Sequence, residues 1–101
     1  MSGYVAVLVI HLHFPNAASL KGKRKDLQSV KALLRQRLGA SVAEVEHQDT
    51  WQRSTLLASV VAGSPGRLDE AADRIEAWLD ARFPEGVRVE RIAVSVSDLQ
   101  P

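Results

Sequence analysis

Hydrophobic residues in this chain recur with two different periods, and the order of these periods restricts the fold more than any other feature. Strict alternation is typical of strands, whereas a spacing of three to four residues is typical of an amphipathic helix. Alternation predicts strands over residues 4–14, 41–48, 52–62 and 87–97, and helical spacing predicts helices over residues 19–38 and 65–82. This βαββαβ order is that of ferredoxin-like domains. We therefore expect an α+β fold with two helices on one face of a four-stranded antiparallel sheet.

Local signals support several of these boundaries. Ser64 is a favourable N-cap residue, Pro65 suits the first helical position, and Gly39 follows the first helix as a C-cap. The two middle strands form a hairpin that turns at residues 49–51. The alternation changes phase between Val89 and Ile92, which predicts a bulge near residues 90–91.

Length and composition favour one small intracellular domain. The 101 residues are 46% hydrophobic, which suits a single domain spanning residues 1–101. The chain has no cysteine, so it contains neither a disulfide nor a thiol nucleophile and is compatible with a reducing cytoplasm. The apolar run at residues 4–10 is far shorter than the roughly 20 residues of a membrane helix. We expect a cytoplasmic protein that does not enter a membrane.

The face of the sheet that the helices leave open is expected to be apolar. Alternation assigns to it Val5, Val7, Val9, Leu57 and Val61, together with Val89 and Ala93. Such a surface is too apolar to remain in water, so a partner should cover it. The simplest partner is a second copy of the chain, and we expect a homodimer.

Charge is distributed unevenly between the two helices. Residues 21–37 contain seven basic side chains and one acidic side chain, a net charge of +6, whereas residues 65–82 carry three basic and five acidic side chains, a net charge of −2. The basic residues crowd a helix start, where the backbone already favours anions. This arrangement predicts an edge that binds phosphate, most plausibly of an RNA backbone. The predicted contacts are Lys21, Lys23, Arg24, Lys25, Lys31, Arg35 and Arg53.

An internal acid is the alternative partner for this basic cluster. The first and second strands should run parallel, so the first helix begins at the same end of the sheet as the hairpin turn. Lys23 lies nearest the core side of the helix, and Glu46 or Asp49 could serve as its anion. We therefore treat His47, Asp49 and Trp51 as one site with the helix start. Trp51 either folds over the core as a lid or forms an exposed anchor for stacking or binding.

Catalytic and metal-binding signatures are absent from the sequence. The serines lie in strands or at a cap, and no glycine-rich phosphate loop is present. Alternation assigns His11 and His13 to the open face and His47 to the helix-covered face, about 10 Å away across two strand spacings. We expect no metal, no cofactor and no enzymatic activity. The enzymatic alternative would be a small anionic substrate held by Lys23, Arg24, His47 and Arg53.

Two motifs, residues 19–24 (SLKGKR) and residues 42–56 (VAEVEHQDTWQRSTL), resemble the bacterial YlxP-type family of small domains of unknown function. The resemblance extends over nearly the whole chain and implies a ferredoxin-like fold. Family members commonly have an acidic residue or another helix former where Gly22 stands, so the glycine is expected to loosen the first helical turn. Genes of this family often neighbour those of translation initiation factor two and ribosome-binding factor A. The resemblance therefore implies a partner in ribosome assembly and identifies no catalytic or binding residues.

Overall fold

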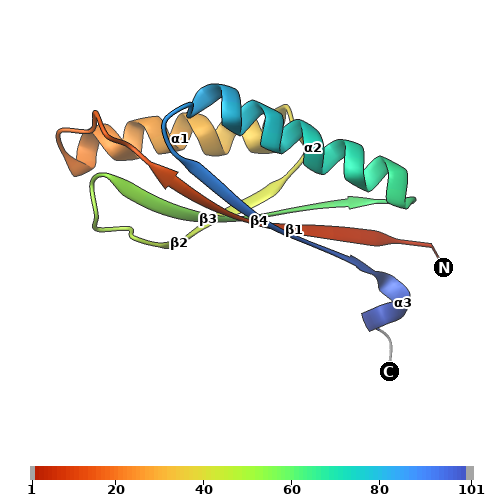
Figure 1. Ribbon diagram of the computed structural model, residues 1–101. Helices are drawn as coiled ribbons and strands as arrows, with labels where there is room; N and C mark the ends of the chain where they lie inside the picture. Colours follow the sequence, from red (N-terminus) through yellow and green to blue (C-terminus); the bar gives the residue numbers. More distant parts are fainter. Residues whose placement is uncertain (1, 100–101) are drawn as a thin grey trace.

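The computed structural model describes residues 2–99 and has the predicted α+β architecture (Figure 1). Its elements are β1 (Tyr4–His13), α1 (Leu20–Gln36), β2 (Ser41–Glu46), β3 (Arg53–Ala62), α2 (Pro65–Arg82), β4 (Val87–Ser95) and α3 (Val96–Leu99). The strand order is β2-β3-β1-β4, and all neighbouring strands are antiparallel. The last strand ends at Ser95, two residues before its predicted end, and continues as the short helix α3.

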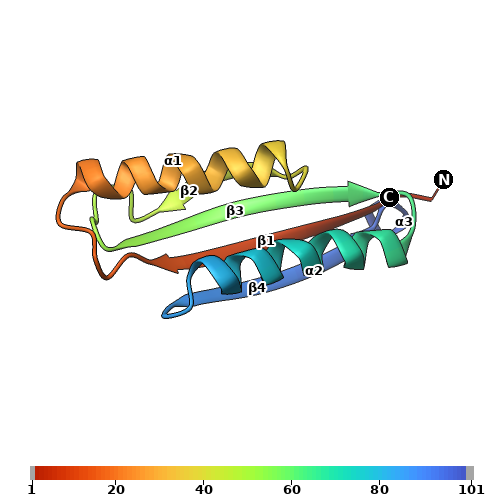
Figure 2. The same ribbon diagram turned by 90° about the horizontal axis from the view of Figure 1, so that it is seen from above.

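Helices α1 and α2 cover the same face of the sheet, as predicted, and enclose the core against it (Figures 1 and 2). Figure 2 shows α1 along the β2–β3 side of the sheet and α2 along the β1–β4 side. Leu8, Ile10 and Leu56 point from the central strands into this layer and are fully buried. Leu34 of α1 and Ile75 of α2 meet them from above, also with 0% exposure. Within residues 2–99, no helix combines the length and apolar composition that a membrane crossing requires.

The ends of the main helices follow the sequence signals. The hydroxyl of Ser64 accepts a hydrogen bond from the Arg67 amide at 3.3 Å and caps α2, with Pro65 at the start of the helix. Gly39 has a φ of 68°, in the left-handed region that only glycine adopts easily. This conformation lets the Ala40 amide donate to the Leu34 carbonyl at 2.9 Å, which closes the end of α1.

The predicted bulge near residues 90–91 is wrong. Strand β4 pairs with β1 in one unbroken register, from Ser95 opposite Tyr4 to Val87 opposite Leu12. Directly opposed residues share a face of the sheet. Arg91 therefore lies opposite Leu8 on the helix-covered face. This register places the arginine beside acidic side chains of α2, and it pairs with Asp73 at 2.8 Å and with Glu76 at 2.5 Å.

The unbroken register also changes which β4 residues reach the open face. Val89 and Ala93 lie opposite Ile10 and Ala6 on the helix-covered face, which corrects their assignment to the open face. Ile92 and Val94 take their place, opposite Val7 and Val5. The other five residues of the predicted open face are where expected, since Val5 pairs with Val61 and Val9 with Leu57, and Val7 lies between them.

The bulge in this sheet lies in β2. Glu44 pairs with Leu56, but Glu46 pairs with Thr55, so Val45 is an additional residue in the strand. The register places Val42 and Glu44 on the helix-covered face and Ala43 on the open face. This is the reverse of the predicted alternation, which placed His47, and with it the other odd-numbered residues of the strand, under the helices. Val42 is buried, whereas Ala43 and Val45 are exposed.

The left-handed conformation of Gly39 leads to a stability prediction. We expect Gly39→Ala to lower the free energy of unfolding by about 1 kcal/mol, because a Cβ is strained at positive φ even though no atom lies within 4 Å of it. Gly63→Ala is the matched control, since its Cβ also meets no atom within 4 Å and its φ is not positive. Urea unfolding of both variants measures the difference, and equal midpoints would contradict the conformational argument.

Candidate functional site

Lys23 is the most unusual residue near the start of α1, because its side chain is completely buried. Its ammonium group donates to the His47 carbonyl at 2.6 Å and to the Thr50 carbonyl at 2.7 Å. The carboxylate of Glu44 lies 3.4 Å from the same nitrogen. Two of the three N–H donors of the ammonium are thus hydrogen-bonded, and the carboxylate balances its charge. Burial of the charge is tolerable because it is paired and hydrogen-bonded.

Glu44 reaches Lys23 from the helix-covered face of β2. Its Oε2 also accepts a hydrogen bond of 2.6 Å from the hydroxyl of Ser54, which is itself buried at the start of β3. This contact explains why Glu44 lies on the helix-covered face of β2, because a carboxylate on the open face could not reach the lysine. Lys23 is thus unavailable to an external anion, which corrects its prediction as an RNA contact. The internal acid is Glu44 rather than the predicted Glu46 or Asp49.

The Lys23 contacts confirm that the start of α1 and the hairpin turn meet at one end of the sheet. His47 has a φ of 64°, which is unfavourable for a residue with a Cβ, and its carbonyl accepts from the Thr50 amide at 3.1 Å. The ammonium binds the carbonyls at both ends of this tight segment. Lys23 therefore compensates for the strained conformation and holds the turn against the helix.

The other five predicted RNA contacts within residues 21–37 differ from Lys23. Lys21, Arg24 and Lys25 are exposed, Lys31 is half-buried, and Arg35 is exposed. The guanidinium of Arg35 donates to the Val42 carbonyl at 2.7 Å and ties the last turn of α1 to β2. Among residues 2–99, none of these five side chains forms an ion pair with an acid. They form the α1 basic surface, defined as Lys21, Arg24, Lys25, Lys31 and Arg35.

The first turn of α1 is closed despite Gly22. The hydroxyl of Ser19 accepts a hydrogen bond from the Gly22 amide at 3.1 Å, and the carbonyl of Ser19 accepts from the Lys23 amide at 3.1 Å. The Ser19 cap and the buried Lys23 side chain therefore hold the turn in which the sequence predicts loosening.

Arg53 does not belong to the α1 basic surface. It pairs with His13 across β1 and β3 and lies on the open face, on the other side of the sheet from α1. The open face at this end contains a pocket of about 420 Å³. Its lining consists of His11, Leu12, His13, His47, Arg53, Ser54, Thr55, Gly86, Val87 and Arg88.

This pocket corrects the predicted separation of the histidines. His47 lies beyond the end of β2, so strand alternation does not control its direction, and it lines the same pocket as His11 and His13. His11 contacts Thr55 at 3.3 Å through Nδ1 and lies 3.5 Å from Glu90 through Nε2. In the part of the chain that the structure describes, no three histidine or acidic side chains are grouped closely enough to hold a metal ion.

Asp49 and Trp51 are both exposed in the hairpin turn. Trp51 is 49% exposed. With about half of its surface in solvent, it fits the exposed anchor better than the lid over the core, and it lies at the end of the molecule where α1 begins.

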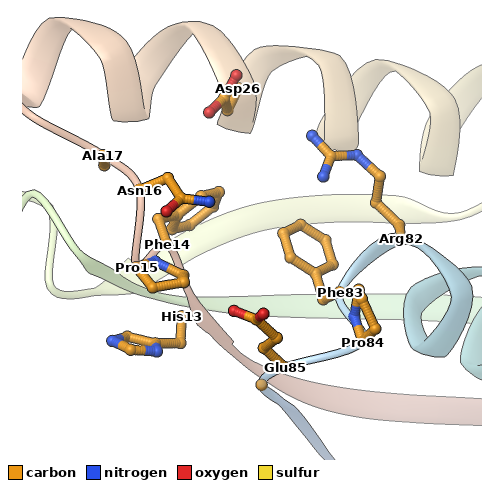
Figure 3. Close-up of a pocket in the computed structure, with 11 residues that line it drawn as sticks. His13, Phe14, Pro15, Asn16, Ala17, Asp26, Arg82, Phe83, Pro84 and Glu85 are labelled. Carbon is orange, nitrogen blue, oxygen red and sulfur yellow. The ribbon is translucent and has the colours of Figure 1, made fainter.

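A second, smaller pocket of about 250 Å³ lies on the helix side of this same end (Figure 3). Phe14 and Phe83 form its apolar floor with an edge-to-face contact of 5.6 Å between ring centres. Figure 3 shows Asp26 of α1 and Arg82 of α2 on opposite sides of the opening, with Glu85 beneath. Because the charged groups differ in sign, this pocket has no evident preference for an anion or a cation.

Two charged groups of β4 have shifted pKa values. A hydrogen bond from Arg88 holds the pKa of Glu90 below its usual value, and the short Arg88–Glu90 distance of 2.6 Å is the cause. The hydrogen bond to Asp73, with the charge of Glu76 nearby, raises the pKa of Arg91. Both groups therefore remain charged at neutral pH.

Sequence reasoning missed Glu44, Ser54 and Arg88. Glu44 lies two residues after Val42 in β2, so the two side chains are on the same face of the strand. An acid on the face of a buried residue was the signal that could have revealed it. Ser54 likewise lies two residues before the buried Leu56 in β3, so its position on the buried face could have been recognised in the same way. Arg88 has no comparable signal, because only the register of β4 brings it beside His11.

The buried ammonium leads to a second stability prediction. Lys23→Met should lower the free energy of unfolding by about 3 kcal/mol, because it leaves the Glu44 carboxylate and two turn carbonyls without their donor. Lys25→Met, an exposed position on the same helix, should change it by less than about 0.5 kcal/mol. Urea unfolding compares the two variants. Equal stabilities would show that the Lys23 contacts are not essential to the fold.

Comparison with known proteins identifies the family. Residues 5–93 match the family model described as "Protein of unknown function (DUF503)". The uncharacterized protein YlxP of Bacillus subtilis (strain 168) is 33% identical over 70 residues, which cover 69% of this chain and 75% of that protein. Among solved structures, the de novo designed protein Foldit4 has a similar fold, with a TM-score of 0.57 and 10% identity over 92% of this chain and 97% of that one. The chain therefore belongs to the DUF503 family, as its resemblance to YlxP-type proteins implies.

Proposed function

We propose that this protein is a non-enzymatic cytoplasmic domain that binds RNA, free or within a ribosome-assembly particle, through the α1 basic surface. One observation carries the proposal. Once Lys23 is paired internally, the five cations of this surface have no acidic partner among residues 2–99. Asp26 is the single acid in residues 21–37, and it lines the neighbouring pocket.

The position of the basic side chains supports an external anion. Lys21, Arg24 and Lys25 lie three and four residues apart, so they occupy one side of the first turns of α1. Repulsion between these cations and the helix dipole is unfavourable in isolation, and a polyanion would relieve it. Trp51 lies exposed in the turn that Lys23 holds against this helix start, where it could stack on a base. Arg53 is excluded from this surface because it faces the other side of the sheet.

A second candidate function is self-association through the open face. The side chains there are 76% exposed at Val61, 57% at Ile92 and 39% at Leu57. Together with Val5, Val7, Val9 and Val94, they form a continuous apolar area that we call the valine face. A two-fold axis through this area would bury the same residues of both copies. Homodimerisation and RNA binding are compatible, because the valine face and the α1 basic surface lie on opposite sides of the sheet.

RNA binding predicts a salt-dependent affinity that fails when the α1 charges are reversed. We expect an oligoribonucleotide to bind the protein in fluorescence anisotropy, with an affinity that falls steeply as salt rises. The variant Lys21→Glu/Arg24→Glu/Lys25→Glu should bind at least about tenfold more weakly, with a shallower salt dependence.

The matched control is Arg67→Glu/Arg74→Glu/Arg82→Glu in α2, which changes the net charge by the same amount. It should keep most of the affinity. Equal losses in the two variants would show that only net charge matters, and no binding by the unmodified protein would refute the proposal.

Self-association predicts a monomer when the valine face carries a charge. Val61→Lys should convert a dimer into a monomer in sedimentation equilibrium, because two lysines would meet without solvent at the interface. The residue is 76% exposed, so the substitution should leave the fold intact. Ala77→Lys, on the exposed side of α2, is the control and should remain dimeric. A monomeric unmodified protein would contradict this second function.

A further inference from the structure

The pocket on the open face is formed where three strands meet at one end of the sheet. His11 and His13 come from the end of β1, Arg53 and Thr55 from the start of β3, and Arg88 from the start of β4. Its volume of about 420 Å³ is within the range of pockets that hold small molecules. The open face therefore has two parts: the valine face, and this polar pocket beyond it.

Close packing between β1 and the start of β4 shapes the pocket wall. The His13 amide donates to the Gly86 carbonyl at 3.2 Å. A Cβ on Gly86 would lie only 3.1 Å from the Cβ of His13, so the glycine permits this approach. The wall is thereby defined by backbone contacts, and His11, His13, Arg53 and Arg88 are attached to strands, whereas His47 comes from the turn after β2.

The pocket lining has the charge of an anion site. It contains two arginines, three histidines and the Thr55 hydroxyl, and no aspartate or glutamate, whereas the hydroxyl of Ser54 is bound to Glu44 on the helix-covered face. Acids lie just outside it: Glu90 is 2.6 Å from Arg88 and 3.5 Å from His11, and Glu46 is 3.8 Å from His47. Arg53 forms no ion pair with any residue from 2 to 99, so its five N–H donors remain available.

The two ring nitrogens of His11 have different surroundings. Its Nδ1 is engaged by the Thr55 hydroxyl at 3.3 Å, which orients the ring. Its Nε2 is buried and makes no hydrogen bond with any described residue, and the Glu90 carboxylate lies 3.5 Å from it. A buried nitrogen without a hydrogen bond usually has a partner in a functional state of the protein, and a phosphate oxygen would compete with Glu90 for this one.

We propose that this pocket binds the phosphate group of a small phosphomonoester, the size of a sugar phosphate or a nucleoside monophosphate. Guanidinium groups match phosphate oxygens with paired N–H donors, and Arg53 is the arginine of the lining without an acidic partner among residues 2–99, whereas Arg88 is already bound to Glu90. The ring N–H groups of His11 and His13 are further donors, and both residues are on β1, the strand between those of the two arginines. The site is separate from the α1 basic surface, since the sheet lies between the two, and it goes beyond the proposed RNA binding.

The test follows the histidine ring signals by NMR at one fixed pH while AMP, ribose 5-phosphate or inorganic phosphate is added. We expect the signals of His11, His13 and His47 to shift together and to saturate, with both phosphomonoesters binding more tightly than inorganic phosphate. Sodium chloride at equal ionic strength should produce no saturable shift. Saturation by inorganic phosphate alone, or an equal response to chloride, would overturn the proposal.

Arg53→Gln should weaken AMP binding roughly tenfold, which corresponds to the loss of one charge-assisted contact. Arg67→Gln, an exposed arginine of α2, is the matched control and should bind like the unmodified protein. Backbone amide spectra show whether each variant is folded, and His11→Phe, which removes both ring nitrogens, should weaken binding independently. Equal affinities in the Arg53 and Arg67 variants would overturn the assignment.

The α1 charge-reversal variant separates this proposal from RNA binding. Lys21→Glu/Arg24→Glu/Lys25→Glu leaves the pocket lining unchanged and should keep its affinity for AMP. Loss of AMP binding in this variant would place the anion on α1 and refute the open-face site. Failure of RNA binding alone would leave the AMP result unaffected.

Discussion

The buried ion pair between Lys23 and Glu44 is the constraint on which the functional end of this domain depends. It joins three elements that are distant in sequence: the first turn of α1, strand β2 and the turn that follows it. Because the ammonium also binds both turn carbonyls, removing it would leave several polar groups unsatisfied at once. The pair therefore holds the start of α1, and with it the exposed cations of that turn, close to β2 and the hairpin turn. Lys23 itself is no longer one of the cations that face solvent.

The register of β4 decides which residues form the open face. Strand β4 pairs with β1 without interruption, and Arg91 lies on the helix-covered side, where it pairs with Asp73 and Glu76. The consequence is that Ile92 and Val94 join the valine face, while Arg88 joins the histidines at the other end. One surface of the sheet thus combines an apolar area suited to protein association with a polar pocket suited to an anion. The α1 basic surface lies on the opposite side.

The sequence predicted the elements better than it predicted the direction of their side chains. The apolar alternation of Val5, Val7 and Val9 correctly placed these residues on the open face, because β1 is the central strand and is paired on both sides. Alternation failed in β2, where a bulge at Val45 and an acid under the helix reversed the expected faces. It failed in β4 because Arg91 occupies a position on the helix-covered face, where the alternation predicts an apolar residue. In both strands the charged residue on the helix-covered face is paired with an opposite charge on a helix.

The sequence by itself determined the βαββαβ order, the helix ends at Ser64 and Gly39, and the excess of positive charge on residues 21–37. These features arise from local propensity and composition, which neighbouring residues can express without the rest of the fold. Only the tertiary structure decided that Lys23 is internal, that Arg53 lies away from α1, and that His47 joins His11 and His13. Each of these outcomes depends on strand register and on contacts between residues far apart in the chain. Such contacts exist only when the sheet and helices have packed together.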